Sequence, residues 1–168
     1  MQTDRTSKRV VPDNLKAPRI VVHKSDRKLE LFDGNKLIKT YTVVLGFTPK
    51  GDKEVEGDGK TPEGTFYVFA KNPASKFHLS LGLSYPSKED AERGLEKGII
   101  STPERDEIVK AIDAKAMPLQ KTALGGEIYI HGGDTAADWT DGCVAMKNDE
   151  IEELYDAIPI GTEVAILK

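Results

Sequence analysis

The sequence predicts a mainly β or α+β domain with two or three helices at its periphery. Two observations support this fold class. Short runs of β-branched and aromatic residues recur along most of the chain, several with apolar side chains at alternate positions, as in half-buried strands. Only two or three segments show helical spacing, so the excess of strands argues against a parallel βαβ sheet.

The chain has room for one domain and a short tail. Its 168 residues lie within the usual size range of a single domain. Residues 1–17 mix charges with Pro12 and show no apolar period, so we expect a flexible N-terminal leader. The folded domain is then expected at residues 18–168.

The strand signals begin directly after this leader. The turn Asp33-Gly34-Asn35 separates two apolar runs, which is a strong signal for a β-hairpin. The segment 46–64 is rich in glycine and charge and is typical of a loop. Two further apolar runs follow it and are expected to join the same sheet. The strands expected in this half are 20–22, 28–32, 36–45, 65–70 and 77–83.

Helical patterns appear in the second half of the chain. Ser-Lys-Glu-Asp at Ser87 is a capping signal for the first helix, and Ile108 and Ile112 give the second its i, i+4 spacing. A third helix is expected to open at Asn148 and to stop at Pro159. The expected helices are thus 87–97, 103–116 and 148–158, and the expected strands are 127–131 and 162–167.

Composition excludes several classes of function. The net charge is −4 and no basic stretch exceeds Lys8-Arg9, so nucleic acid is not an expected partner. No apolar run approaches the ~20 residues of a membrane-spanning helix, and stable membrane insertion is not expected. His, Cys and acidic residues nowhere show metal-ligand spacing, so we expect neither metal nor cofactor. The N-terminus lacks the apolar core of a secretory signal, so the protein is either cytoplasmic or has lost its signal.

Two residues suggest nucleophilic catalysis. Cys143 is the single cysteine, and Gly142 before it lets backbone N–H groups approach a developing oxyanion. His131 ends an apolar strand twelve positions earlier and could serve as the base that a thiol nucleophile needs. Each signal alone has a structural explanation, since lone cysteines are commonly inert and buried. Together they make a Cys-His pair a candidate site.

The same residues lie in recognisable motifs. Ile130-His131-Gly132-Gly133 followed by Thr140-Asp141-Gly142-Cys143-Val144-Ala145-Met146 resembles the signature of the L,D-transpeptidase catalytic family, also called YkuD-like. The loop from Gly57 to Phe66, with Asp58-Gly59-Lys60-Thr61-Pro62-Glu63-Gly64, resembles that family's second landmark. The resemblance covers about residues 19–168, and it implies a β-sandwich with peripheral helices.

The resemblance also implies an activity. Cys143 would attack the L,D peptide bond after meso-diaminopimelate in a peptidoglycan stem, form a thioester, and pass the acyl group to an amine. His131 would be the general base, held by the carbonyl of Gly132, and the N–H groups of Gly142 and Cys143 would bind the oxyanion. Peptidoglycan stem peptides would be the partners, carbapenems would inhibit, and the location would be the periplasm or cell envelope.

The substrate pocket departs from the family pattern. Asp141 stands where most members have histidine, Ala145 stands where most have arginine or asparagine, and the loop from His131 to Cys143 is shorter. We expect Asp141 on the acceptor side, recruiting an amine, or bonded to the N–H groups of its own turn. Further candidates for substrate contact are Thr140, Trp139 and His78.

Three functions remain open at this point. The first is a transpeptidase, in which an amine resolves the thioester. The second is an L,D-acting hydrolase or endopeptidase of the same fold, in which water resolves it. The third is a peptidoglycan-binding module without catalysis, and the intact Cys143 and His131 argue against it.

Overall fold

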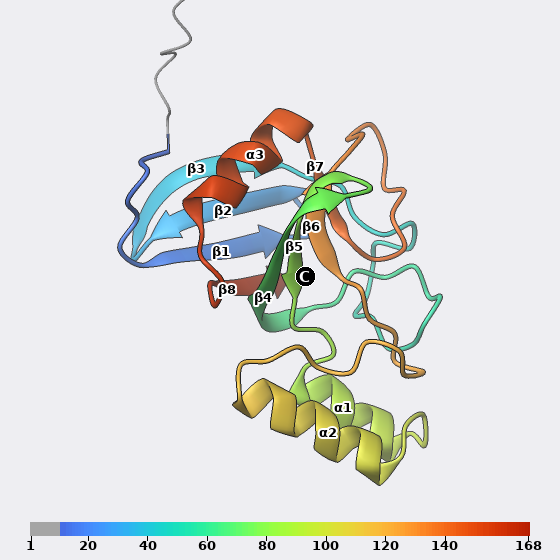
Figure 1. Cartoon of the computed structure of the whole chain (residues 1–168). Helices are drawn as coiled ribbons and strands as arrows, with labels where there is room; N and C mark the ends of the chain where they lie inside the picture. Colours follow the sequence, from blue (N-terminus) through green and yellow to red (C-terminus); the bar gives the residue numbers. More distant parts are fainter. Residues whose placement is uncertain (1–10) are drawn as a thin grey trace, which may run out of the picture.

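The computed structural model describes residues 11–168, and its centre is one eight-stranded sheet (Figure 1). The strands are β1 (Pro18–His23), β2 (Lys28–Asp33), β3 (Lys36–Thr42), β4 (Gly64–Ser75), β5 (His78–Leu83), β6 (Tyr129–Gly132), β7 (Val144–Met146) and β8 (Glu163–Leu167). The helices are α1 (Lys88–Glu96), α2 (Thr102–Asp113) and α3 (Asn148–Ala157). The mainly β fold with three helices confirms the expected fold class.

The sheet curls until its two edges meet. The strand order is β3-β2-β1-β8-β4-β5-β6-β7, and β4 pairs both with β8 and with β5. Directly after β3, Val44 exchanges two main-chain hydrogen bonds, each 2.9 Å long, with Ala145 of β7. The architecture is therefore barrel-like, and this closure carries the Cys143 segment against the first hairpin.

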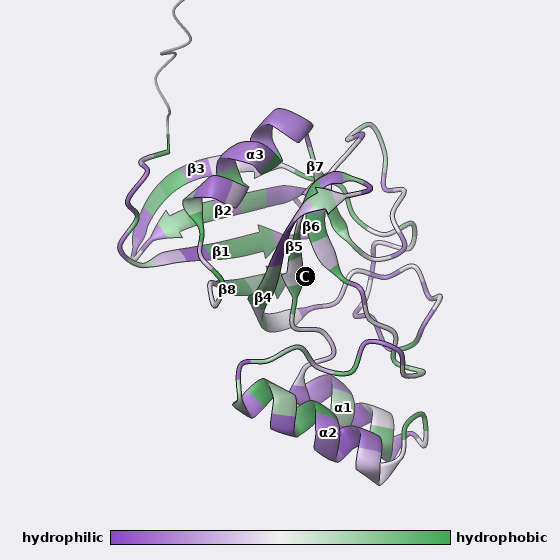
Figure 2. Ribbon diagram, viewed as in Figure 1, coloured by the Kyte–Doolittle hydropathy of each residue, from purple (hydrophilic) through white to green (hydrophobic). Residues whose placement is uncertain are grey.

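Alternating side chains of the strands fill the interior. Ile20 and Val22 of β1, Leu29 and Leu31 of β2 and Val164 of β8 are all buried in one hydrophobic cluster. This alternation is the two-residue period of a sheet with one face in the core. Figure 2 shows apolar residues gathered along these strands and hydrophilic residues on the outer faces of the helices.

The three helices lie in two places. The α1 and α2 helices form a hairpin at one end of the molecule and share a small apolar cluster with Leu124 (Figure 1). Both begin with a complete capping box, at Ser87 and at Ser101. The α3 helix buries Ile151 and Leu154 in the main core and contacts β5 and β6. It therefore packs directly beside the strand that carries His131.

The N-terminal segment differs from the expectation of a flexible leader. Residues 1–10 lie outside the described part of the chain, but residues 11–17 are held in place. Val11 is buried in the main core, and the carboxylate of Asp33 accepts the N–H groups of Lys16 and Ala17 at 3.1 and 2.7 Å. The sequence did not indicate these contacts, because their partners, the Asp33 turn and the main core, become neighbours of this segment only after folding.

The expected elements are present, with shifted ends. The segment 43–45 is not part of β3, since Val44 turns to pair with Ala145 instead. The β4 strand runs five residues beyond the expected 65–70, to Ser75, and β6 begins at Tyr129 instead of residue 127. The three-residue strand β7 was not predicted, because so short a run carries no periodicity. Among the described helices, none is long and apolar enough to cross a membrane.

Candidate active site

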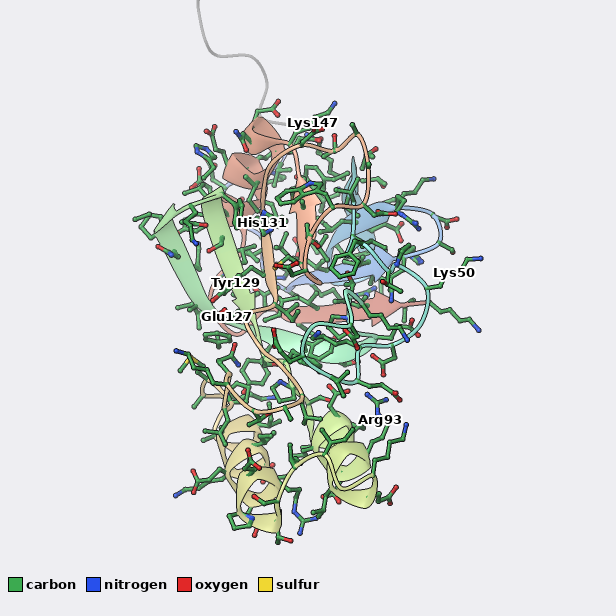
Figure 3. The ribbon with its side chains drawn as sticks, turned by 90° about the vertical axis from the view of Figure 1, so that its right-hand side faces the viewer. Lys50, Arg93, Glu127, Tyr129, His131 and Lys147 are labelled. Atoms are coloured by element: carbon green, nitrogen blue, oxygen red, sulfur yellow. The ribbon has the colours of Figure 1, made fainter. Side chains whose placement is uncertain are left out.

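A cavity of about 640 Å³ lies between β6, the tip of the β4–β5 hairpin and the turn that holds Cys143. Figure 3 shows His131, Tyr129 and Glu127 one below another along the chain that forms one wall of this region. The cavity is lined by five of the residues that the sequence predicts for the site: His131, Trp139, Thr140, Asp141 and Cys143. The tertiary structure therefore brings the candidate nucleophile and base to one cavity.

The thiol of Cys143 is partly exposed and bonded to main chain. Its Sγ accepts the N–H of Tyr129 and donates to the carbonyl of Glu127, both at 3.4 Å. Burial raises the pKa of the Cys143 thiol to about 11, and the charge of Asp141 adds to this, while the N–H of Tyr129 opposes it. The free protein therefore holds a neutral thiol at neutral pH.

The imidazole of His131 is buried and fixed in one orientation. The ring is 1% exposed, and Nδ1 lies 2.7 Å from the carbonyl oxygen of Gly132. A carbonyl oxygen only accepts, so Nδ1 carries the proton and Nε2 of the neutral ring keeps a lone pair. Burial lowers the pKa of His131, so the ring is neutral at pH 7. This tautomer can accept a proton at Nε2.

Two aromatic rings cover the imidazole. Phe77, at the tip of the β4–β5 hairpin, stacks on His131 with ring centroids 4.5 Å apart and an interplanar angle of 23°. Trp139 tilts against the same imidazole at 5.7 Å, and its indole N–H donates to the carbonyl of Asp134. Phe77 and Trp139 are 42% and 39% exposed, so each presents an apolar face to a ligand.

The turn before Cys143 rests on the second landmark loop. Gly142 has φ +138°, and a Cβ there would lie 2.8 Å from the carbonyl oxygen of Lys60. The hydroxyl of Thr140 accepts the N–H of Gly142 at 3.2 Å and donates to the carbonyl of Cys143 at 2.7 Å. Thr140 thus closes the turn, and Gly142 is required because only glycine fits against the loop at this φ.

This geometry alters the expected oxyanion site. The N–H groups of Gly142 and Cys143 were both expected to face the cavity as donors. The N–H of Gly142 is taken by Thr140 in this structure, because the threonine hydroxyl lies within the same turn. The N–H of Cys143 remains as the candidate donor.

The structure does not bring His78 to the cavity. Its ring is 40% exposed and pairs with Glu152 of α3 at 2.6 Å. His78 thereby ties the β4–β5 hairpin to α3, next to Phe77 in sequence. Asp141 is exposed on the cavity wall, and among the described residues no hydrogen bond joins it to His131 or to its own turn. The expected turn-bonding role of Asp141 is therefore not seen.

Lys53 and Phe77 are site residues that the sequence did not single out. Lys53 lines the cavity although its side chain is only 2% exposed, and it comes from the segment 46–64, which was expected to be a polar loop outside the core. The signal available in the sequence was the acidic Asp58 five positions later, which pairs with Lys53 at 2.9 Å. Phe77 was assigned to a strand, and nothing local indicates that its ring meets His131.

No cluster of three His, Cys, Asp or Glu side chains suited to a metal ion occurs among residues 11–168. The groups that line the cavity are a thiol, a neutral imidazole, backbone N–H groups and charged side chains. Such a set can form and resolve a covalent acyl-enzyme.

The sequence was compared with protein-family models and with known proteins. Residues 17–166 match the family model described as the L,D-transpeptidase catalytic domain, YkuD. The chain is 29% identical over 156 residues to YqjB of Bacillus subtilis, covering 89% of this chain and 70% of that protein. It is 24% identical over 146 residues to YafK of Escherichia coli K12, covering 83% of this chain and 46% of YafK. Both relatives carry the name "Putative L,D-transpeptidase".

Solved structures share the fold. The helical cell shape determining protein Pgp2 of Campylobacter jejuni, solved as a K307A mutant, matches with a TM-score of 0.59 at 20% identity, covering 97% of this chain and 51% of Pgp2. Bd1075 of Bdellovibrio bacteriovorus matches with a TM-score of 0.60 at 24% identity, covering 93% of this chain and 49% of Bd1075. The chain thus spans about half the length of these structures. Because the family model matches nearly the whole domain, the chain belongs to the L,D-transpeptidase catalytic domain family.

Proposed function

We propose that this domain is a peptidoglycan L,D-transpeptidase that works through a thioester on Cys143. The observation that carries the proposal is the presence of Cys143 and a buried, neutral His131 in the lining of one cavity. Because Nδ1 of His131 is held by the carbonyl of Gly132, Nε2 is the nitrogen left for the thiol. Membership of the family supports this assignment.

Acylation begins from a neutral thiol and a neutral imidazole. The Sγ proton leaves the carbonyl of Glu127 and passes to Nε2 of His131 as Sγ attacks the carbonyl carbon of the stem peptide. The C–S bond forms and the carbonyl becomes an oxyanion, which accepts the N–H of Cys143. Such a fixed donor contributes roughly 3–4 kcal/mol. Tying Nδ1 to Gly132 stabilises the imidazolium that results, since its charge strengthens that hydrogen bond.

The acyl-enzyme then forms and is resolved. The imidazolium of His131 gives its proton to the leaving amine, the C–N bond breaks, and the thioester remains on Cys143. A second amine attacks the thioester, its proton passes to His131, and Cys143 leaves and recovers its proton. The product is a new amide, so the acceptor amine must enter on the side from which the first amine departed.

Asp141 is suited to recruit that acceptor. Its carboxylate is exposed on the cavity wall two residues from the nucleophile. A stem amine is positively charged before it reacts, and an exposed charge pair with Asp141 contributes about 1 kcal/mol or less. We propose that Asp141 raises the local concentration of the amine and does not take part in bond making.

The proposed substrate implies that the domain acts in the cell envelope. Peptidoglycan lies outside the cytoplasmic membrane, so the proposed reaction requires export to the periplasm or wall. The match to Pgp2, a protein that determines helical cell shape, supports a substrate in the wall.

Purified wall fragments with tetrapeptide stems test the proposal. Incubation with the protein followed by mass spectrometry should show cross-linked dimers, and Cys143→Ala should give none while keeping its fold by circular dichroism. Shortened stems without dimers would assign the domain to hydrolysis instead. Turnover retained in Cys143→Ala would refute the thioester mechanism.

A further inference from the structure

Lys53 places a buried ammonium group in the wall of the catalytic cavity. Its side chain is 2% exposed, and Nζ donates to the carbonyl of Val55 at 3.0 Å and to Asp58 at 2.9 Å. Lysine has three N–H donors, so within the described residues these contacts leave one donor. A buried ammonium on a residue of the same cavity as Cys143 calls for an explanation beyond loop anchoring, because exposing it to solvent would avoid the cost of desolvation.

The hydrogen bond to Asp58 leaves the Lys53 ammonium able to bind a further acceptor. The two carboxylate oxygens of Asp58 also accept the main-chain N–H groups of Glu54, Val55 and Lys60, at 2.9 to 3.1 Å. Its negative charge is thus shared among four donors, and Lys53 supplies one of them. Asp58 fixes the position of the ammonium and leaves it able to donate to a further acceptor.

Lys53 and Cys143 contact different points of the chain that carries His131. Along the wall shown in Figure 3, the chain descends from His131 through Tyr129 to Glu127, and Sγ of Cys143 is bonded between Tyr129 and Glu127. Two residues before Glu127 in the sequence is Gly125, where a Cβ would lie 3.0 Å from Cε of Lys53. Along this chain, the two residues that bond Sγ of Cys143 therefore lie between His131 and the glycine that is in contact with Lys53.

We propose that Lys53 binds a carboxylate on the acyl part of the donor substrate. The inference rests on the proposed function. His131 must protonate the leaving amine, so the leaving group lies toward His131 and the acyl part extends past Cys143 toward Lys53. A stem peptide carries carboxylates on its acyl part, and an ammonium at that end selects for them.

The other charged groups of the cavity act more weakly on such a ligand. Glu56, Glu127, Asp141 and Lys76 also line it, and all four are exposed. Water and salt screen exposed charges, while a buried charge is screened much less. Lys53 is the buried cation among the described residues of this cavity, so it dominates recognition of an anionic group despite the three acidic neighbours.

The first test leaves the protein unchanged. Tetrapeptide stems are prepared in which each carboxylate of the acyl part is converted, one at a time, to a carboxamide. For one of these stems the wild-type protein should lose about tenfold to hundredfold in kcat/KM, the range for a charge-assisted hydrogen bond. That stem identifies which carboxylate Lys53 binds. Changing only the leaving residue should not produce this loss.

The second test compares the same carboxylate and carboxamide stems in variants of Lys53 and of a control lysine. Lys53→Met keeps the length of the side chain and removes the charge, and Lys50→Met is the matched control, an exposed lysine of the same loop that points away from the site (Figure 3). Lys53→Met should process the carboxylate and the carboxamide stems at equal rates, whereas Lys50→Met should discriminate as the wild type does.

The outcomes separate this inference from the proposed function. Equal wild-type rates on all stems, with turnover that still requires Cys143, would overturn the role of Lys53 and leave the thioester mechanism standing. Discrimination that persists in a folded Lys53→Met would overturn it as well. Absence of any turnover that requires Cys143 would remove both proposals. If Lys53→Met does not fold, the wild-type comparison decides.

Discussion

The alkylation rate of Cys143 should rise steadily with pH across the neutral range. Burial and the charge of Asp141 raise the pKa of the thiol to about 11, from an ordinary value of 9.0. At pH 7.5 the thiolate fraction is then about 1 in 3,000 instead of about 1 in 30, so alkylation is roughly 100-fold slower than for an exposed cysteine. Below the pKa, each pH unit should increase the rate about tenfold.

Neutralising Asp141 should speed this reaction slightly. Asp141→Asn removes a negative charge that raises the pKa of Cys143, so the pKa falls and the thiolate fraction grows. Asp141 is exposed, which limits the interaction to about 1 kcal/mol and the gain in rate to about fivefold at a fixed pH. The same variant should mildly weaken transfer to an amine without preventing acyl-enzyme formation. Asp149→Asn, an exposed change on α3, is the control.

Iodoacetamide labelling followed by mass spectrometry, at intervals from about pH 6 to 10, measures both effects. A rate that stays constant between about pH 6 and 8 would show a thiolate–imidazolium pair in the free protein and would refute the neutral resting state. Slower alkylation in Asp141→Asn would contradict the electrostatic effect assigned to that carboxylate. Equal losses of acylation and amine transfer would contradict its role toward the acceptor.

Three further predictions concern the catalytic turn and its base. His131→Ala should slow acylation by about 10²- to 10⁴-fold, as loss of a general base does, measured by single-turnover mass spectrometry; unchanged acylation would exclude His131 as the base. A carbapenem should add its mass to the wild type and not to Cys143→Ala, and a wild type free of adduct after long incubation would mean a closed pocket. Gly142→Ala should lower stability by about 1–3 kcal/mol, because φ is +138° and its Cβ would press on the Lys60 carbonyl. Gly57→Ala is the control, because Gly57 also has a positive φ but a Cβ there would meet nothing within 4 Å. Thermal unfolding of the two variants therefore separates backbone strain from the contact with Lys60. An equal loss of stability in Gly142→Ala and Gly57→Ala would exclude a contribution from that contact.

Much of the fold could be predicted because its signals are local. The Asp33-Gly34-Asn35 turn appears between β2 and β3, and Gly34 takes the positive φ that such a turn requires. The capping box predicted at Ser87 is complete in α1. Family membership was equally accessible, because the motifs around His131 and Cys143 are short and contiguous, and the family match confirms it.

The errors share one physical cause. Val11 is buried and Ala17 is hydrogen-bonded to Asp33, although nothing in residues 11–17 resembles a strand or a helix. Val44 leaves the expected strand because its partner is Ala145, which follows it by about a hundred residues. Pairings across such separations depend on closure of the whole sheet, and a periodicity read in a short window does not contain them.

The sequence alone determined the identity of the nucleophile and base candidates, the order of the elements other than β7, and the family. Only the tertiary structure decided how their chemistry is set: the neutral state of Cys143, the tautomer of His131, the loss of the Gly142 N–H to Thr140 and the exclusion of His78 from the cavity. It also placed Lys53 within the same cavity. Charge, tautomer and access depend on burial and on neighbours distant in sequence, and these exist only once the sheet has closed.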